Sequence, residues 1–256
     1  MAAVVVAGVV ALVVGVLGAP SEGEDTPVKV ERPKVSPTSE PASTLVARPG
    51  SSPGLSHSAT PTATPTPPPV VRGFRFPIEG ACLPAEDDLM PNAPREYRFG
   101  IHEGVDFYPG RACADIERGM PVLAAKTGIV IRADVDYKDI TQEEMDGLLG
   151  RSAQQGFTDP ATLDRLRGRQ VWIDHGNGVV TRYCHLLAVE PGIAKDVAVA
   201  AGQVVGRVGN TGTPEGVSDP NMENHLHFEI RVGESFLGQG LSVAEMRRLW
   251  TVAFSP

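Results

Sequence analysis

The segment from residue 20 to residue 72 limits how much of this 256-residue chain can fold. It is rich in Pro, Ser and Thr, poor in aromatic residues, and ends in the run SATPTATPTPPPVV. Such a sequence buries too little apolar surface to offset its conformational entropy, and its prolines favour extended conformations. We therefore expect a disordered linker over 20–72 and one folded domain over 73–256.

An uncharged apolar run, AAVVVAGVVALVVGVLG, precedes this linker. Its 17 residues are near the lower limit for crossing a bilayer and also suit the apolar part of a secretory signal. A buried core segment is the alternative, but the linker offers it no packing partner. We expect residues 1–19 to be a signal or membrane anchor. This places the protein outside the cytoplasm, anchored to the membrane or secreted into the cell envelope.

The charge of the chain is concentrated in the predicted domain. Residues 1–72 contain five Lys or Arg and five Asp or Glu, so the whole formal charge of −8 falls within 73–256. An acidic domain without a basic stripe is poorly suited to binding nucleic-acid phosphates. We expect no nucleic-acid partner.

Short apolar runs bounded by Gly and turn residues predict a mainly β domain with antiparallel sheets. Asn177 and Gly178 accept positive φ, which a tight hairpin turn requires. Residues 138–168 contain helix formers and helix-start signals, and Ser242 is placed to cap a final helix over 242–250. We thus expect a small helical insertion and a C-terminal helix. The predicted strands lie in GFRFPI (73–78), PVLAAKTGIVIRADV (121–135), QVWIDHGNGVVTRYCHL (170–186), VAAGQVVGRVGNTG (199–212) and NHLHFEIR (224–231).

Histidines occur at three separate places in this predicted β domain. His225 and His227 are two residues apart, so they share one face of an extended strand. His102 and Asp106 are separated by four residues and would also share a face, while His185 ends the strand TRYCHL. Zinc favours imidazole and carboxylate ligands, and three protein ligands with one open position are typical of a catalytic centre.

These residues also have structural interpretations. A strand histidine such as His185 is often simply hydrogen-bonded, His175 is placed to support a turn, and His57 lies in the linker. His102–Glu103 begins like the helical metalloprotease motif, but the second histidine is missing and Gly104 disfavours a helix. Glu103 is therefore not expected to be a general base.

The three cysteines point to different environments. Cys82 and Cys113 flank the first histidine motif, and an exported domain would permit a disulfide between them. Their spacing alone leaves free thiols equally open. Cys184 is expected to be a small buried residue rather than a zinc ligand, with Tyr183 and His185 in phase on the opposite face.

Four motifs, HEGVD, IDHGNGVVTRYCHL, GQVVGRVGNTG and HLHFEIR, occur in the order found in the lysostaphin-type, or LytM-like, zinc endopeptidases of bacterial peptidoglycan. The chain resembles this family over residues 73–232. The resemblance implies a compact antiparallel β domain of the duplicated-hybrid-motif type. It also implies Zn²⁺ bound by His102, Asp106 and His227, with His185 and His225 as catalytic histidines.

The implied activity is zinc-dependent hydrolysis of peptide bonds in peptidoglycan, in a cross-bridge or a stem peptide. In that mechanism His225 accepts the proton of the attacking water and His185 stabilises the oxyanion, and the two histidines can also share the proton. The insertion over 138–168 and the approach TPEGVSDPNMEN over 213–224 depart from the family pattern. The first can wall or cover the groove, and the second bears on substrate choice.

Two other functions are compatible with parts of the sequence. Relatives that have lost metal ligands regulate other wall hydrolases without catalysis, although the ligand set here is complete. A biotinyl- or lipoyl-carrier-like domain modified at Lys126 is suggested by AAKTGIV and AGQVVGRVG. That interpretation leaves the three histidine segments unexplained.

Overall fold

The computed structural model describes residues 71–256. The apolar run, the linker up to residue 70 and His57 lie outside the described residues, so what the sequence predicts for them stays a prediction. The elements are η1 (Asp87–Leu89), β1 (Pro94–Arg95), η2 (Glu96–Arg98), β2 (Gly100–Ile101), β3 (Val105–Phe107), β4 (Pro121–Leu123), β5 (Gly128–Ala133), α1 (Gln142–Gln155), α2 (Pro160–Leu166), β6 (Val171–Asp174), β7 (Val179–Cys184), β8 (Ala188–Val189), β9 (Ala198–Val199), β10 (Val204–Arg207), α3 (Pro214–Ser218), β11 (Leu226–Val232), β12 (Ser235–Phe236) and α4 (Val243–Ala253).

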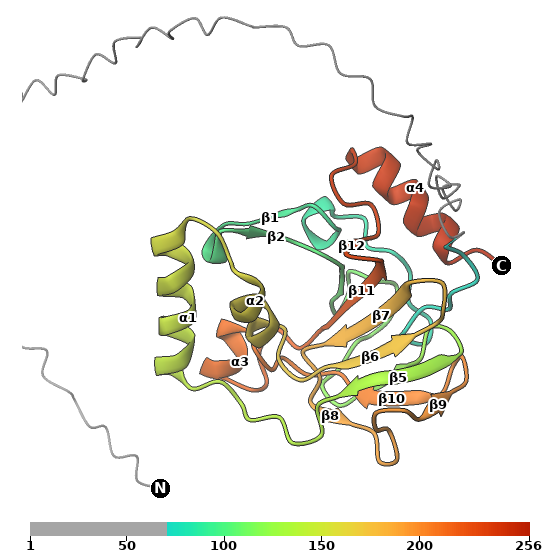
Figure 1. The fold of residues 1–256 in the computed structure, drawn as a ribbon, viewed down its shortest axis with the longest axis horizontal. Helices are drawn as coiled ribbons and strands as arrows, with labels where there is room; N and C mark the ends of the chain where they lie inside the picture. Colours follow the sequence, from blue (N-terminus) through green and yellow to red (C-terminus); the bar gives the residue numbers. More distant parts are fainter. Residues whose placement is uncertain (1–70) are drawn as a thin grey trace, which may run out of the picture. The chain divides into compact units, whose positions relative to one another are not determined.

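Two antiparallel sheets make up most of the domain (Figure 1). The larger has the order β12-β11-β7-β6-β5-β9, and β3 also pairs with β11. The smaller has the order β4-β10-β8, and β1 and β2 form a separate two-stranded ribbon. The mainly antiparallel β fold predicted from the sequence is confirmed.

Alternation along the strands builds one core from both sheets. Tyr183 and Phe228 are buried from the larger sheet, and Val122 and Val205 from the smaller. The hydroxyl of Tyr183 accepts a hydrogen bond from the backbone N–H of Ala125 at 2.7 Å, which satisfies a polar group inside the core. The opposite faces of β7 and β11 are thereby left free to carry polar side chains.

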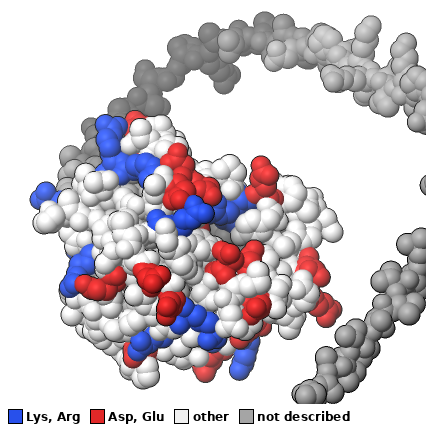
Figure 2. Space-filling model, turned by 180° about the vertical axis from the view of Figure 1, so that it is seen from behind, with Lys and Arg blue, Asp and Glu red and all other residues white. Residues whose placement is uncertain are grey.

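Charged side chains of both signs are interspersed on the face of the domain seen in Figure 2. Acidic and basic groups lie next to one another there, with no continuous basic stripe. A stripe of that kind is the usual footprint of a surface that binds nucleic acid.

The predicted hairpin joins β6 to β7, but its loop is longer than a two-residue turn. Gly176, Asn177 and Gly178 all have positive φ, at 81°, 53° and 73°. The N–H of His175 donates to the carbonyl of Val179 at 2.9 Å and closes the loop. Residues that tolerate positive φ thus identify the position of the turn in the sequence. The length of the loop depends on where hydrogen bonding between β6 and β7 ends.

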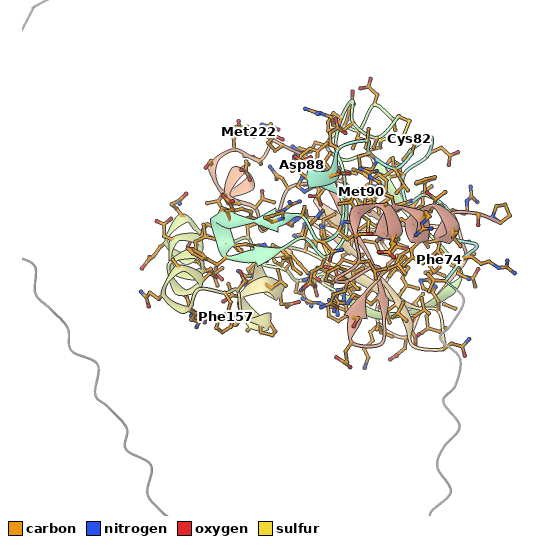
Figure 3. All side chains as sticks on the ribbon, turned by 90° about the horizontal axis from the view of Figure 1, so that it is seen from above. Phe74, Cys82, Asp88, Met90, Phe157 and Met222 are labelled. Carbon is orange, nitrogen blue, oxygen red and sulfur yellow. A yellow bond between two sulfur atoms is a disulfide. The ribbon has the colours of Figure 1, made fainter. Side chains whose placement is uncertain are left out.

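The predicted strand over 73–78 is wrong. The N–H of Phe74 donates to Ala253 at 2.9 Å and that of Arg75 donates to Ala125 at 2.7 Å, so neighbouring residues bond to different elements. Pro77 has no N–H to contribute to a ladder. Figure 3 shows Phe74 beside α4, where this segment packs without joining a sheet.

The helical insertion lies between β5 and β6, within the predicted range. Thr141 caps α1 by accepting from the N–H of Glu144, and α1 ends at Gly156 with φ 73°. Asp159 caps α2, with Pro160 at its first position. Figure 3 places Phe157, between the two helices, on the opposite side of the domain from Phe74. The insertion has a small core of its own, made of Ile140, Met145, Leu148 and Leu166, with Leu149 and Val217 packed against it.

The predicted C-terminal helix is confirmed as α4. Ser242 and Glu245 form a reciprocal capping box at its start. Trp250 of this helix is fully buried, and its ring centroid lies 6.1 Å from that of Phe228. The helix therefore covers one end of the core. None of the helices within residues 71–256 combines the length and the apolar character needed to cross a membrane.

Changing Ser242 to alanine is expected to lower the free energy of unfolding by about 1 kcal/mol, because the cap of α4 is lost. Urea unfolding of the full chain measures this difference. Thr251→Ala is the matched control, because its hydroxyl bonds only the carbonyl of Arg247 within the same helix. Equal destabilisation by both changes would contradict a role of the cap.

The cysteines pair as the sequence permits. Cys82 and Cys113 form a disulfide, with their Cα atoms 5.4 Å apart, and Cys184 is a buried free thiol. Burial of Cys184 agrees with the prediction. The disulfide ties the segment before β1 to the loop after β3, and both border the groove described below.

Candidate metal centre

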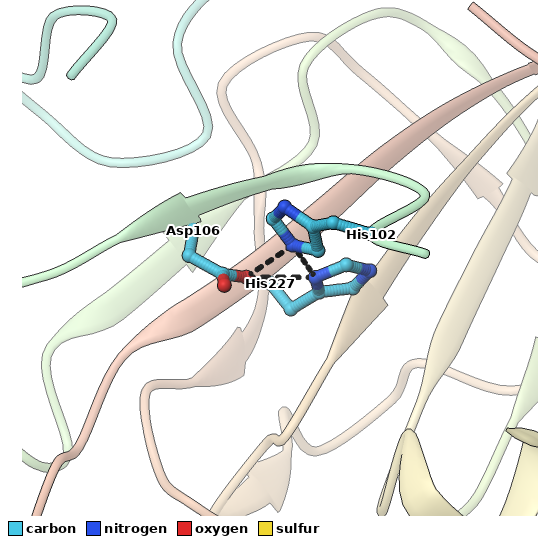
Figure 4. A group of neighbouring side chains, drawn as sticks. All are labelled: His102, Asp106 and His227. Atoms are coloured by element: carbon cyan, nitrogen blue, oxygen red, sulfur yellow. Dashed lines mark hydrogen bonds and ion pairs between the residues drawn. The ribbon is translucent and has the colours of Figure 1, made fainter. Parts of the chain in front are cut away.

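Three side chains from distant parts of the chain converge on one point (Figure 4). His102 Nε2 lies 2.9 Å from His227 Nδ1 and 2.9 Å from Asp106 Oδ1, and His227 Nδ1 lies 2.7 Å from Asp106 Oδ1. All three residues are buried. These are the residues that the family resemblance implies as zinc ligands.

Strand register explains this convergence. β3 pairs antiparallel with β11 so that Asp106 lies directly opposite His227. His102 precedes β3, and the segment between them crosses the backbone of β11 closely. A Cβ at Gly104 would collide with the carbonyl of Phe228, so only glycine allows this approach.

Hydrogen bonds on the far side of both rings fix which nitrogens face the centre. His102 Nδ1 donates to the carbonyl of Met90 at 3.0 Å, and His227 Nε2 donates to Glu229 Oε1 at 3.2 Å. In the neutral rings the inward nitrogens are therefore acceptors. The lone pairs of His102 Nε2 and His227 Nδ1 and the oxygen Oδ1 of Asp106 then face one another with no hydrogen atom between them. Such a donor set fits a divalent cation, and its chemistry suits zinc.

Protonation energetics also favour a positive charge at this point. Burial lowers the pKa of His102 to about 4, so this ring is a neutral ligand at neutral pH. Burial opposes the charged forms of Asp106 and His227. Their contacts outweigh it, because His102 and His227 lower the pKa of Asp106, while hydrogen bonds to Asp106 and Glu229 raise the pKa of His227. A metal ion would replace the proton that this pair attracts.

Arg95 holds the second oxygen of the carboxylate. Its Nη2 lies 3.0 Å from Asp106 Oδ2, and its Nη1 donates to the carbonyl of Asp88 at 2.9 Å. With Oδ2 taken, Oδ1 is the oxygen left for the centre. Arg95 is not among the residues predicted from the sequence, because the β1–β2 ribbon that carries it has no pattern that points to the site.

The other two predicted histidines border this centre. His225 Nε2 lies 3.9 Å from Asp106 Oδ1, and the ring centroid of His185 lies 4.9 Å from that of His225. The Nδ1 atoms donate to the carbonyls of Glu223 and Thr211, respectively, each at 2.8 Å. Burial lowers the pKa of both histidines. Both are thus neutral at neutral pH, with Nε2 as the free acceptor.

His185 reaches the site by a route different from the predicted one. Tyr183 faces the core, whereas His185 follows the end of β7 and has φ 60°, so the two residues are not in phase along one strand. The strand alternation assumed for His185 ends at Cys184. Cys184 itself faces the polar side of the sheet, near His227 and Glu229.

A second group of possible ligands shares one residue with the first. Cys184, His227 and Glu229 offer donor atoms within 4.8 Å of one another. Glu229 is already paired with Arg167 at 2.6 Å, and burial raises the pKa of Cys184 far above its usual value, so its thiol keeps its proton. Zinc binds thiolate rather than thiol, and this group is therefore the poorer metal site.

The centre lies in a groove of about 1080 Å³. Leu149, Leu163 and Leu166 of the insertion line it, so the insertion forms a wall of the groove. Tyr108 also lines the groove, and its ring stacks on His225 with centroids 4.1 Å apart.

The remaining candidates have structural roles. His175 bonds the carbonyl of Thr127 and the hydroxyl of Thr181, at 2.9 and 2.8 Å, as expected of a residue that supports the turn. Glu103 accepts from Arg167 and Arg231 and is not free to act as a base. Lys126 donates to the carbonyl of Arg72 at 2.8 Å and lies over the ring of Phe74.

Comparison with known proteins gives matches over the same part of the chain. A family model described as peptidase family M23 matches residues 100–239, which is more than half of the chain and includes all five site residues. A zinc-containing peptidase from Vibrio cholerae is similar at 21% identity and a TM-score of 0.40, covering 64% of this chain and 38% of that one. Lysostaphin, the antimicrobial peptidase from Staphylococcus simulans, is similar at 19% identity and a TM-score of 0.39. That match covers 74% of this chain and 57% of lysostaphin. The chain thus spans less than two thirds of either protein.

Proposed function

The chain belongs to peptidase family M23, and from this premise we propose that it is a zinc-dependent endopeptidase that hydrolyses peptide bonds in bacterial peptidoglycan. The observation that carries the proposal is the convergence of His102, Asp106 and His227, with two further histidines beside them. A complete ligand set supports catalysis over the purely regulatory role known among such proteins. The Cys82–Cys113 disulfide supports an oxidising location outside the cytoplasm.

His102 Nε2, Asp106 Oδ1 and His227 Nδ1 would hold the ion. Zinc with three protein ligands supplies an acidified water, with a pKa near 7, and polarises a peptide carbonyl. The protein's own groups then move protons. His225 Nε2, close to Asp106, accepts the proton of the attacking water as general base.

His185 can stabilise the oxyanion only in its protonated form. Its Nδ1 proton is donated to Thr211, so a neutral ring turns a lone pair, not an N–H, to the groove. A proton on Nε2 makes it a donor. We infer that whichever of His185 and His225 takes up the proton of the attacking water then carries that proton on Nε2. From there it donates a hydrogen bond to the oxyanion or passes the proton to the leaving amine. The two histidines thus act as a pair.

The location and partners follow from the same proposal. The partner is a peptidoglycan peptide, and the apolar N-terminal run would keep the domain at the membrane if it is not cleaved. The proline-rich linker would then let the domain reach into the wall.

Removing zinc from the purified full chain is expected to abolish hydrolysis of peptide bonds in purified peptidoglycan, and adding zinc back is expected to restore it. Mass analysis of the released fragments identifies the bond cleaved, because hydrolysis of a peptide bond creates a new amine and a new carboxylate. Cleavage of glycan bonds would contradict the proposal. A zinc-loaded chain that leaves peptidoglycan intact but stimulates another wall hydrolase would favour the regulatory function.

A further inference from the structure

The end of the helical insertion contacts two parts of the candidate site, namely Glu229 beside His227 and the backbone of His185. Arg167 follows α2 directly, and its side chain is only 8% exposed. Its Nε lies 2.6 Å from Glu229 Oε1, the same oxygen that accepts from His227 Nε2 at 3.2 Å. A continuous chain of contacts thus runs from the insertion through Glu229 to a residue of the metal centre.

Arg167 is the main partner of this carboxylate oxygen. Arg182 and Arg231 also pair with Glu229, but through the other oxygen and at 3.4 and 3.3 Å. Nη2 of Arg167 binds Glu103 as well, so the planar guanidinium bridges two carboxylates. This bridge fixes the position of Oε1 and, through it, the orientation of the His227 ring.

The backbone beside Arg167 positions the other half of the site. The N–H of His185 donates to the carbonyl of Arg167 at 2.9 Å. Gly168 has φ 67°, and a Cβ there would collide with the carbonyl of Thr211, which is the acceptor of His185 Nδ1. The insertion therefore meets His185 through two backbone groups.

We propose that Arg167 is a positioning residue that makes the helical insertion part of the metal centre, by holding Glu229 against His227. This inference rests on the proposed function for the identity of the metal. Outer carboxylates that orient a ligating histidine raise its basicity, and their loss costs about 10- to 100-fold in metal affinity. The insertion then serves the chemistry as well as forming a wall of the groove.

The test compares Arg167→Met with Arg165→Met in the full chain. Arg165 lies on α2, two residues before Arg167, but its side chain binds Glu144 and the carbonyl of Lys138, all within the insertion. Zinc affinity is measured by competition with a chelator, and the Co²⁺ form is compared by its visible spectrum. Arg167→Met is expected to weaken zinc binding about 10- to 100-fold and to change the spectrum, with the Arg165 variant like wild type.

A further variant separates positioning from folding. Arg167→Lys keeps the charge but cannot bridge two carboxylates, so it should recover part of the zinc affinity. Thermal unfolding of each variant shows whether it is folded.

The outcomes distinguish this inference from the proposed function. A wild-type chain that binds zinc, with Arg167→Met equal to it in affinity and in spectrum, would overturn the positioning role alone. Equal losses in the Arg165 and Arg167 variants would overturn it too, because the insertion would then act only through its stability. A wild-type chain that binds no zinc would overturn the proposed function, and the inference with it.

Discussion

Replacing His227 by alanine is expected to leave the purified chain without bound zinc. The change removes one of three ligands from a buried centre and breaks the contacts to Asp106 Oδ1 and Glu229 Oε1 at 2.7 and 3.2 Å. The loss of affinity should exceed the roughly 10- to 100-fold that changes outside the ligand set cost. Metal analysis after dialysis measures the zinc retained per chain.

The matched control is His175→Ala. This histidine also makes two hydrogen bonds, but it lies at the β6–β7 turn and outside the site. It should retain zinc in full. Zinc retained equally by both variants would contradict a role for His227 as a ligand.

Replacing His225 by alanine is expected to keep most of the zinc and to lower kcat by about 10²- to 10⁴-fold, the usual contribution of a general base. His225 Nε2 lies 3.9 Å from Asp106, beyond a hydrogen bond, so the centre does not depend on this ring. Its pKa lies below the ordinary value because of burial, and it is therefore a neutral base at neutral pH. The rate at which new amine groups appear in digested peptidoglycan, with zinc content measured on the same sample, reports both effects.

Tyr108→Leu is the control for packing around His225. It removes the stacked ring at 4.1 Å and leaves the hydrogen bond from Nδ1 to Glu223 intact. A smaller fall in kcat than in His225→Ala is expected. If His225→Ala loses as much zinc as His227→Ala, the division between ligand and base is wrong.

The two-residue period of a β-strand predicts those site residues that lie on one segment of the chain. The spacing of His225 and His227 places both on the polar face of the sheet, and the same period would have indicated Glu229 as a third residue on that face. No local pattern joins His102 to His227, since 125 positions separate them. The family resemblance supplied that connection.

Predictions failed where the backbone left the regular pattern. His185 departs from the phase of β7 because the strand ends before it and its φ is positive. The segment 73–78 has an apolar strand-like sequence, yet Pro77 and hydrogen bonds to α4 and to the β4–β5 connection keep it out of the sheets. Arg95 and Arg167 were missed because an ion pair between side chains of separate elements has no signature in the sequence.

The location of the metal in a crystal of the full chain, read from anomalous scattering at the zinc edge, tests the central claim most directly. The account predicts one peak within bonding distance of His102 Nε2, Asp106 Oδ1 and His227 Nδ1, with Glu229 on the far side of the His227 ring. A peak between Cys184, His227 and Glu229, or no zinc in crystals grown with the metal, would contradict it.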